Sequence, residues 1–216
     1  MADASIDNLI ETLADELEPV RPRRLLRGAL WVAAGWIVVG ALLLWIFGMR
    51  HDLAAGILMA PLPMLAFWLI VALGIAAAWS ALRMGLPSVG RDYGGWRWAA
   101  FAALALPLTA IFIGFGDRHG AMEAMHPGHG MGCTLDGLVA GVGVGAALFA
   151  WLTGGAPTSP ERAGWVTGIA AGAAGAATVA LHCSSNDMIH IALWHGLAIP
   201  LWAVAGRLLL APLLRW

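Results

Sequence analysis

Six apolar stretches constrain the fold of this chain more than any other feature. They cover approximately residues 27–48, 56–82, 96–116, 135–153, 164–181 and 189–210. Each is long enough to cross a bilayer as a helix, because about 20 residues span the hydrocarbon core. Since 60% of the residues are apolar and only 12% are charged, we predict an all-α polytopic membrane protein with six transmembrane helices.

The arginines indicate how these spans are oriented. Ten of the twelve basic residues fall in the N-terminal arm, the second-to-third loop, the fourth-to-fifth loop or the C-terminal end. The other two, Arg50 and Arg118, fall in loops on the opposite side. Because basic residues collect on the cytoplasmic side of a membrane, both termini are predicted to be cytoplasmic. Both cysteines and all seven histidines then lie at or near the outer face.

A short amphipathic helix is predicted over residues 3–18, and Pro19 and Pro22 end it. Its apolar face and two of its acidic residues are Ile6, Leu9, Ile10, Leu13 and Leu17, with Asp7 and Glu11. Such a helix is marginal alone in water, and an acidic polar face does not suit anionic lipid. We therefore predict that it docks in a protein groove with a basic rim. Packing against the chain's own cytoplasmic loops is the alternative.

Two domains follow from this division. Residues 1–24 form a cytoplasmic, partner-binding arm, and residues 25–216 form the six-helix membrane domain, in contact with lipid. The middles of the six spans contain no Asp, Glu, Lys or Arg. Pumps and many transporters need ionisable groups at that depth, so ion transport is disfavoured.

The only two cysteines, Cys133 and Cys183, lie on the two arms of a predicted helical hairpin. The midpoint between them is residue 158, inside the predicted turn, so each cysteine is 25 residues from it. Two helical arms of that length rise by roughly 37 Å, which is close to one bilayer with its interfaces. The two thiols should therefore lie at one height on one side of the membrane.

Glycines recur every fourth residue on both arms of this hairpin. They are Gly137, Gly141 and Gly145 on the fourth span, and Gly164, Gly168 and Gly172 on the fifth. Small residues at this spacing let helix backbones approach closely in lipid. The arms are predicted to pack against each other through these glycines, although both sets could instead face other helices. If the arms pair, the thiols come within reach of a disulfide or of a shared ligand.

Potential metal ligands surround both cysteines. The predicted set is Cys133, Cys183, His126, His129, His182, His190 and Met131. Thiolate, imidazole and thioether groups suit thiophilic ions such as copper, zinc or cadmium. Pro127 and the neighbouring glycines predict a loop over residues 126–133, and His195 is the deepest histidine, one or two turns into the last span.

A plain structural disulfide is the alternative to a reactive thiol pair or metal site. Neither CxxC nor HExxH occurs, so no redox or zinc-protease signature supports an enzyme. No catalytic residue is predicted, and no cofactor is certain.

The chain resembles the NrsF-like integral-membrane anti-sigma factors of proteobacteria over nearly its whole length. The resemblance rests on the acidic N-terminal helix before PVRPRRLLRG, on Gly132-Cys133, on GAPTSPERAG before the LHC of 181–183, and on Trp194-His195 and the closing LRW. It implies a protein of the bacterial inner membrane that holds an extracytoplasmic-function (ECF) sigma factor and binds no nucleic acid directly. Two outward-facing cysteines are associated with stress signalling in that family, and they match Cys133 and Cys183.

The resulting hypothesis is a transmembrane anti-sigma factor. The helix at 3–18 holds the sigma factor, and thiol-reactive metal or oxidative stress at Cys133 and Cys183 changes helix packing and releases it. The competing hypothesis is a periplasm-facing copper- or thiol-handling membrane protein.

Overall fold

The structure, a computed structural model, describes residues 2–16, 23–57, 59–86, 94–116, 118–155 and 157–214. Every regular element within these residues is helical. Five helices are long and apolar enough to cross a membrane, namely Leu25–Phe47, Pro61–Met84, Gly130–Thr153, Pro160–Ala180 and Met188–Leu213. The all-α class is confirmed for the described residues, whereas the count of six spans stays a prediction.

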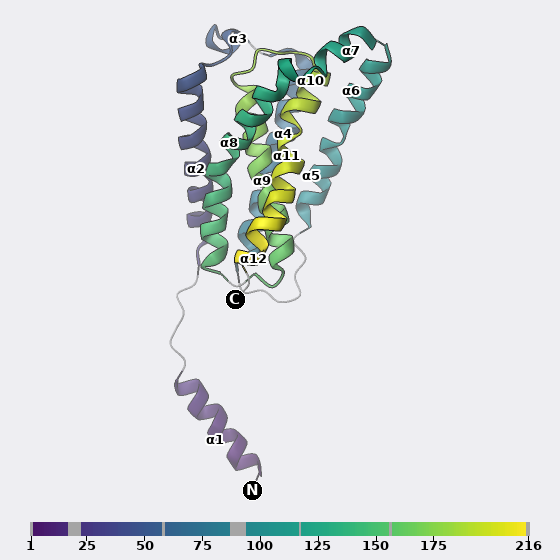
Figure 1. Cartoon of the computed structure of the whole chain (residues 1–216). Coiled ribbons are helices and arrows are strands. Elements are labelled where there is room, and N and C mark those ends of the chain that lie inside the picture. The colour runs from purple at the N-terminus through teal and green to yellow at the C-terminus, as the bar shows by residue number, and fades with distance from the viewer. Residues whose placement is uncertain are drawn as a thin grey trace.

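The N-terminal helix α1 (Ala2–Asp15) lies apart from the bundle in Figure 1. Its apolar residues Ile6, Leu9, Ile10 and Leu13 are all more than half exposed. Leu17 lies outside the described residues, and the side chain of Asp7 does too. A helix is therefore present over most of the predicted range, and its four apolar residues are exposed, while its role as an amphipathic docking helix stays a prediction.

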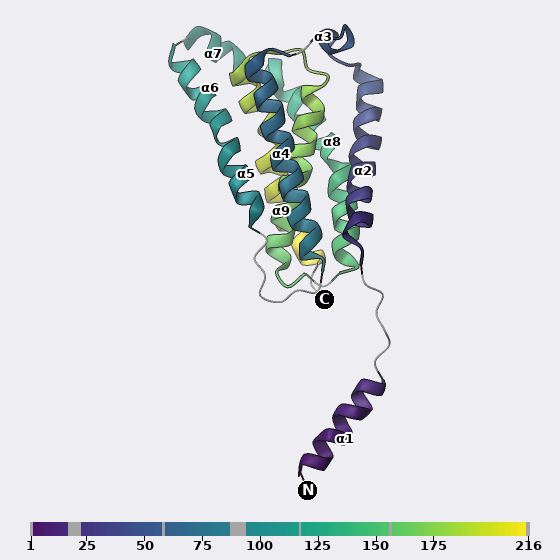
Figure 2. The same cartoon turned by 180° about the vertical axis from the view of Figure 1, so that it is seen from behind.

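The centre of the bundle is α9 (Pro160–Ala180), and almost all of its residues from Ala163 onward are buried. It packs most extensively against α8 (Pro127–Thr153), α4 (Pro61–Met84) and α11 (Ala198–Ala205). Figure 2 shows α4 covering α9 on the face away from α11. Since α9 is mostly glycine and alanine, its neighbours approach its backbone closely.

Glycine contacts join the helices of the bundle. Gly137 of α8 meets Gly175 of α9, while the predicted glycines Gly164, Gly168 and Gly172 face the last span. The ring of Trp202 in the last span covers the remaining two predicted glycines, Gly141 and Gly145. The two arms of the hairpin thus pack together, but the three predicted glycines of α9 contact the last span and not α8.

The helix α2 (Leu25–Phe47) packs on α8 where Gly35 meets Gly143. A Cβ on either glycine would collide with the carbonyl group of the other. The first span is therefore in backbone contact with the helix that carries Cys133. A short helix, α3 (His51–Ala54), follows α2 at the end of the bundle away from α1 (Figure 1).

The third predicted span is two helices, α5 (Gly95–Ala103) and α6 (Ala105–Gly116). Pro107 explains the division, because it has no N–H to donate to the carbonyl of Ala103 and its ring crowds that carbonyl. The two helices follow one another along the outside of the bundle in Figure 1. The apolar stretch was predicted at the right place, but as one unbroken helix.

The last predicted span changes helix type along its length. It consists of α10 (Met188–His190), the π-helical segment η1 (Ile191–His195), α11, a second π-helical segment η2 (Gly206–Leu210) and α12 (Ala211–Leu213). Each π-helical segment precedes a proline, Pro200 or Pro212. Pro212 crowds the carbonyl of Leu208 inside η2, whereas the carbonyl that Pro200 crowds, that of Gly196, lies just beyond η1.

Candidate functional site

Cys133 lies in the second turn of α8 and not in a loop. The helix begins at Pro127, because a proline in the first helical position has the required φ and its missing N–H leaves no bond unmade. His126 caps the helix, and its Nδ1 accepts a hydrogen bond from the N–H of Gly128 at 3.2 Å. The prediction of a loop over 126–133 is therefore wrong. The side chain of His129 lies outside the described ones.

Cys183 lies in the segment 181–187, which joins α9 to α10 and is called the Cys183 loop below. The N–H of Cys183 donates to the carbonyl of Val179 at 2.8 Å, so the first turn of the loop continues from α9. The sulfur atoms of Cys133 and Cys183 are 3.7 Å apart, in agreement with the equal arms of the hairpin. Both thiols are half-buried, and within the described part of the chain neither forms a disulfide.

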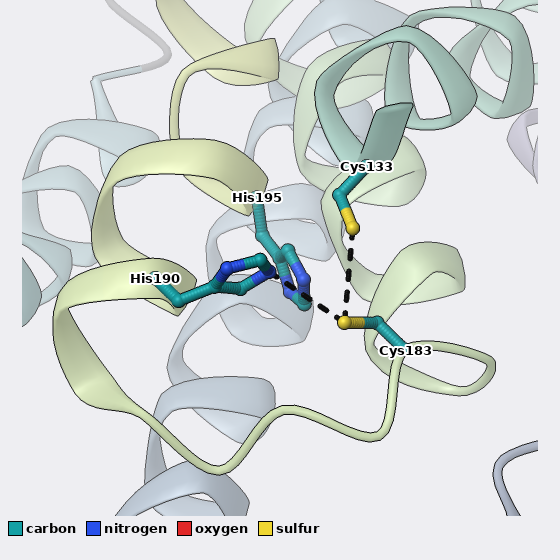
Figure 3. Close-up of side chains that lie close together, drawn as sticks. All are labelled: Cys133, Cys183, His190 and His195. Carbon is teal, nitrogen blue, oxygen red and sulfur yellow. Dashed lines mark hydrogen bonds between the residues drawn. The ribbon is translucent and has the colours of Figure 1, made fainter. Parts of the chain in front are cut away.

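His190 and His195 come from the last span, on either side of the π-helical turn. On an α-helix, residues five apart point about 140° away from each other. In η1 the N–H of Gly196 instead bonds to the carbonyl of Ile191 at 3.0 Å, a bond between residues five apart. This brings the two rings onto one side, with centroids 5.3 Å apart, and Figure 3 shows both beside Cys183.

Trp194 holds this turn against α8. Its ring packs on Gly130, where a Cβ would collide with the indole, and its Nε1 donates to the carbonyl of Ala124 at 2.8 Å. Ala124 ends the short helix α7 (Arg118–Ala124). The Thr134 hydroxyl donates to the Trp194 carbonyl, also at 2.8 Å. Trp194 is thus a buried packing residue that fixes the distance between the histidines and Cys133.

The four side chains form one cluster. Ligand atoms of Cys133, Cys183, His190 and His195 all lie within 4.8 Å of one another. The thiol of Cys133 donates toward Cys183, and this contact, together with the His190 ring 3.6 Å away, lowers the pKa of Cys183. His195 is only 1% exposed, and apart from an electrostatic interaction with Cys183 neither of its ring nitrogens has a hydrogen-bond partner in the described part of the chain.

The structure brings together three of the predicted ligands and adds His195, which the predicted set lacked. His126 caps α8, and Met131 is exposed on its first turns. His182 stacks on Phe47 and lies 3.6 Å from Asp136, so its ring is engaged elsewhere. The sequence signal for His195 was its depth in the span, but the helix type that turns it toward Cys183 was not predicted.

Arg50 fastens the Cys183 loop to the end of α2 that lies away from α1. Its N–H donates to the carbonyl of Leu181 at 3.0 Å, and its Nη2 donates to Asn186 Oδ1 at 2.9 Å. Asp52 accepts two further bonds from the guanidinium group, at 2.6 and 2.7 Å, and these lower the pKa of its carboxyl. Arg50 is 3% exposed, so this residue, which the sequence analysis used only for orientation, is a buried structural clamp.

These features define a helical membrane protein with a thiol and imidazole cluster at one end of its bundle and a separate N-terminal helix with exposed apolar residues beyond the other (Figure 1). A family model described as "Negative regulator of sigma F" matches residues 13–216. The chain belongs to this family, NrsF, which is a regulatory and non-enzymatic kind of protein.

Two curated relatives agree with the family. The chain is 32% identical to the anti-sigma-F factor NrsF of Caulobacter vibrioides, over 97% of this chain and 99% of the relative. It is 30% identical to the probable anti-sigma-F factor NrsF of Azospira oryzae, over 86% and 87% respectively. No solved structure matches the chain.

Proposed function

We propose that this protein is an anti-sigma factor of a bacterial inner membrane. In this proposal α1 holds an ECF sigma factor at the cytoplasmic surface. Cys133 and Cys183, on the periplasmic side, respond to thiol-reactive metal or oxidative stress and cause its release. Membership of the family supports the anti-sigma role, because both relatives carry that name.

The uncovered apolar face of α1 is the observation that carries the docking step. Ile6, Leu9, Ile10 and Leu13 are between 54% and 60% exposed. A 14-residue helix with such a face gains stability when the face is buried, and an amphipathic helix buries it in an apolar groove. The exposed Glu11 on the flank of the face favours a groove with basic residues at its rim.

The contacts of α2 provide a route from the thiols to α1. The outer end of α2 is bound to the Cys183 loop through Arg50, and Phe47 stacks on His182 with ring centroids 5.6 Å apart. Along its length α2 packs on α8, which carries Cys133. The inner end of α2 begins at Leu25, soon after the arm. A change in the thiol pair would therefore act on both contacts that position α2, the one with the Cys183 loop and the one with α8.

Release requires two arrangements of the protein that differ in affinity for the sigma factor. The thiol pair supplies a chemical difference between them. At 3.7 Å the sulfurs are not bonded, whereas a disulfide would bring them to about 2.05 Å and draw α8 toward the Cys183 loop. Modification of either thiol would push the same two segments apart.

Affinity purification of the full-length protein from its native host tests the proposal. It is run beside a variant without residues 2–16 and beside the Cys133→Ser/Cys183→Ser variant, and copurifying proteins are identified by mass spectrometry. We expect an ECF sigma factor with the intact protein and with the serine variant, but not without α1. Oxidant or cadmium should release the sigma factor from the intact protein and leave the serine variant loaded. Absence of any sigma factor from the intact protein would refute the anti-sigma role.

A further inference from the structure

We propose that Cys133, Cys183, His190 and His195 form a tetrahedral binding site for a soft divalent cation of the Zn²⁺ or Cd²⁺ type. The inference deepens the proposed function, and rests on it, by naming the ligand that the sensor takes. The four residues come from α8, the Cys183 loop, α10 and η1, and they converge on one point in Figure 3.

Two of the distances between ligand atoms match the edges of a zinc tetrahedron, and all four atoms lie within 4.8 Å of one another. With Zn–S bonds of about 2.3 Å and Zn–N bonds of about 2.0–2.1 Å, tetrahedral angles separate two sulfurs by about 3.8 Å. A sulfur and a nitrogen are separated by about 3.6 Å in the same geometry. The observed separations are 3.7 Å between the two sulfurs and 3.6 Å between Cys183 Sγ and His190 Nε2.

His195 provides an independent indication of a ligand. Its ring is 1% exposed, and apart from an electrostatic interaction with Cys183 neither ring nitrogen has a hydrogen-bond partner among the described residues. A buried polar atom without a partner is costly and rare in a folded protein. The ring faces the Cys183 sulfur, and its centroid is 5.3 Å from that of His190. A cation at the centre of the cluster would take the lone pair of one nitrogen.

The donor set selects the kind of cation. Two sulfur and two nitrogen donors in a tetrahedron are typical of Zn²⁺, and thiolates also favour Cd²⁺ over hard ions such as Mg²⁺ or Ca²⁺. Two thiolates and two neutral imidazoles cancel the charge of a divalent ion, which suits a half-buried site at the edge of a membrane. Because both thiols are partly exposed, the ion can reach the site from the outer side.

A bound ion would join segments that no covalent bond connects. It would tie Cys133 of α8 to the Cys183 loop, which Arg50 already links to α2, and both to the last span. The π-helical turn of η1 has a role in this arrangement, since it is the feature that turns His195 toward the thiols. The ion thus acts on the helices that position α1.

Cobalt titration of the full-length protein tests the site. The protein is purified in detergent with a non-chelating reductant, stripped of metal, and titrated with Co²⁺, whose visible absorption reports tetrahedral coordination. We expect one Co²⁺ per chain, displaced by Zn²⁺ or Cd²⁺. The Cys133→Ser/Cys183→Ser variant should lose the thiolate-to-cobalt charge-transfer band, and Cys183→Ser alone should weaken it. His195→Gln should keep that band, change the visible spectrum and weaken binding at least tenfold.

His119→Gln is the matched control, because His119 is exposed on α7 at the same end of the bundle and lies outside the cluster. If His195→Gln does not fold, His190→Gln applies the same test to the other imidazole. The inference is overturned if wild-type protein binds no Co²⁺, or if the Cys133→Ser/Cys183→Ser variant binds it equally well. It is also overturned if both histidine variants match His119→Gln.

Sigma-factor retention by the same metal-free preparation separates the two proposals. A retained sigma factor without metal binding leaves the anti-sigma role standing and removes the metal site. Metal binding with the predicted ligand dependence, but no sigma factor, supports the site and refutes the anti-sigma role.

Discussion

Shortening Leu13 to alanine should weaken sigma-factor binding about tenfold. The substitution removes three carbons, and each contributes about 0.8 kcal/mol when it passes from water into a fully apolar contact. Leu13 is 54% exposed, so about half of that contribution is still to be gained from a partner. The expected loss is about 1.3 kcal/mol, close to the roughly 1.4 kcal/mol of a tenfold change in Kd.

Ile10 lies on the same face and is 60% exposed, so Ile10→Ala should cost a similar amount. If the two losses add, the double variant should bind about a hundredfold more weakly. The assay is a titration of full-length protein in lipid nanodiscs with the purified sigma factor, read by biolayer interferometry. Insertion into the membrane should be unchanged, because α1 lies apart from the bundle.

Asn8→Ala is the matched control for these variants. Asn8 is exposed on the opposite face of α1, and alanine there favours the helix. Its Kd should stay within about twofold of wild type, the range of an ordinary surface substitution. If Leu13→Ala also stays within that range, or if Asn8→Ala weakens binding as much as Leu13→Ala does, the apolar face of α1 is not the docking surface.

Three further predictions concern the bundle and the site. Gly175→Ala should lower stability in detergent by about 1–3 kcal/mol, because its Cβ would collide with the Gly137 carbonyl, whereas Gly132→Ala, with nothing within 4 Å, should not. In metal-free protein, the rate of iodoacetamide alkylation of Cys183 should fall less steeply than that of an ordinary thiol as the pH falls from about 8.5 to 6.5. The lowered pKa of Cys183 keeps more of it as thiolate, whereas an ordinary thiol slows about tenfold per pH unit. A rate that follows the ordinary thiol contradicts the assigned hydrogen bonds. Arg50→Ala should speed hydrogen–deuterium exchange in residues 181–187, because the bond to Asn186 is lost. The variant should still retain the sigma factor but no longer release it under oxidant or cadmium. Normal release of the sigma factor by this variant would show that Arg50 is not part of the coupling route.

Hydrophobicity predicted most of the architecture, because burial in lipid and burial in protein demand the same residues. The places of α2, α4, α9 and the last span follow from apolar runs alone. The errors occur where a proline decides the local structure. Pro127 starts a helix where flanking glycines indicated a loop, and Pro107 divides the third span. A proline starts a helix where its missing N–H would have had no partner, as at Pro127, and it interrupts a helix where that N–H would have bonded to an earlier carbonyl, as at Pro107.

Equal spacing from a turn predicted the thiol pair, since distance along two helices of one hairpin depends only on residue number. The same reasoning could not assign glycines to partners. Gly168 recurs in the pattern expected for α8 but meets the Trp202 carbonyl of the last span, while Gly175, outside the pattern, meets α8. A helix such as α9, which has glycine or alanine on every side, lets neighbouring helices approach its backbone closely from any direction. Sequence therefore predicts that such a helix is central, but not which neighbour takes which face.

His195 shows why the cluster needed the structure. Its spacing of five residues from His190 argues against a shared face on an α-helix, where positions three or four apart are neighbours. The π-helical turn reverses that argument, because its bond between residues five apart brings both rings onto one side. Gly130 leaves room for the Trp194 ring, and the Thr134 hydroxyl donates a hydrogen bond to the Trp194 carbonyl. These two contacts hold the turn at one distance from α8. The thiol pair therefore comes from the hairpin, and its imidazole partners come from a helix irregularity that the packing of Trp194 on Gly130 holds against α8.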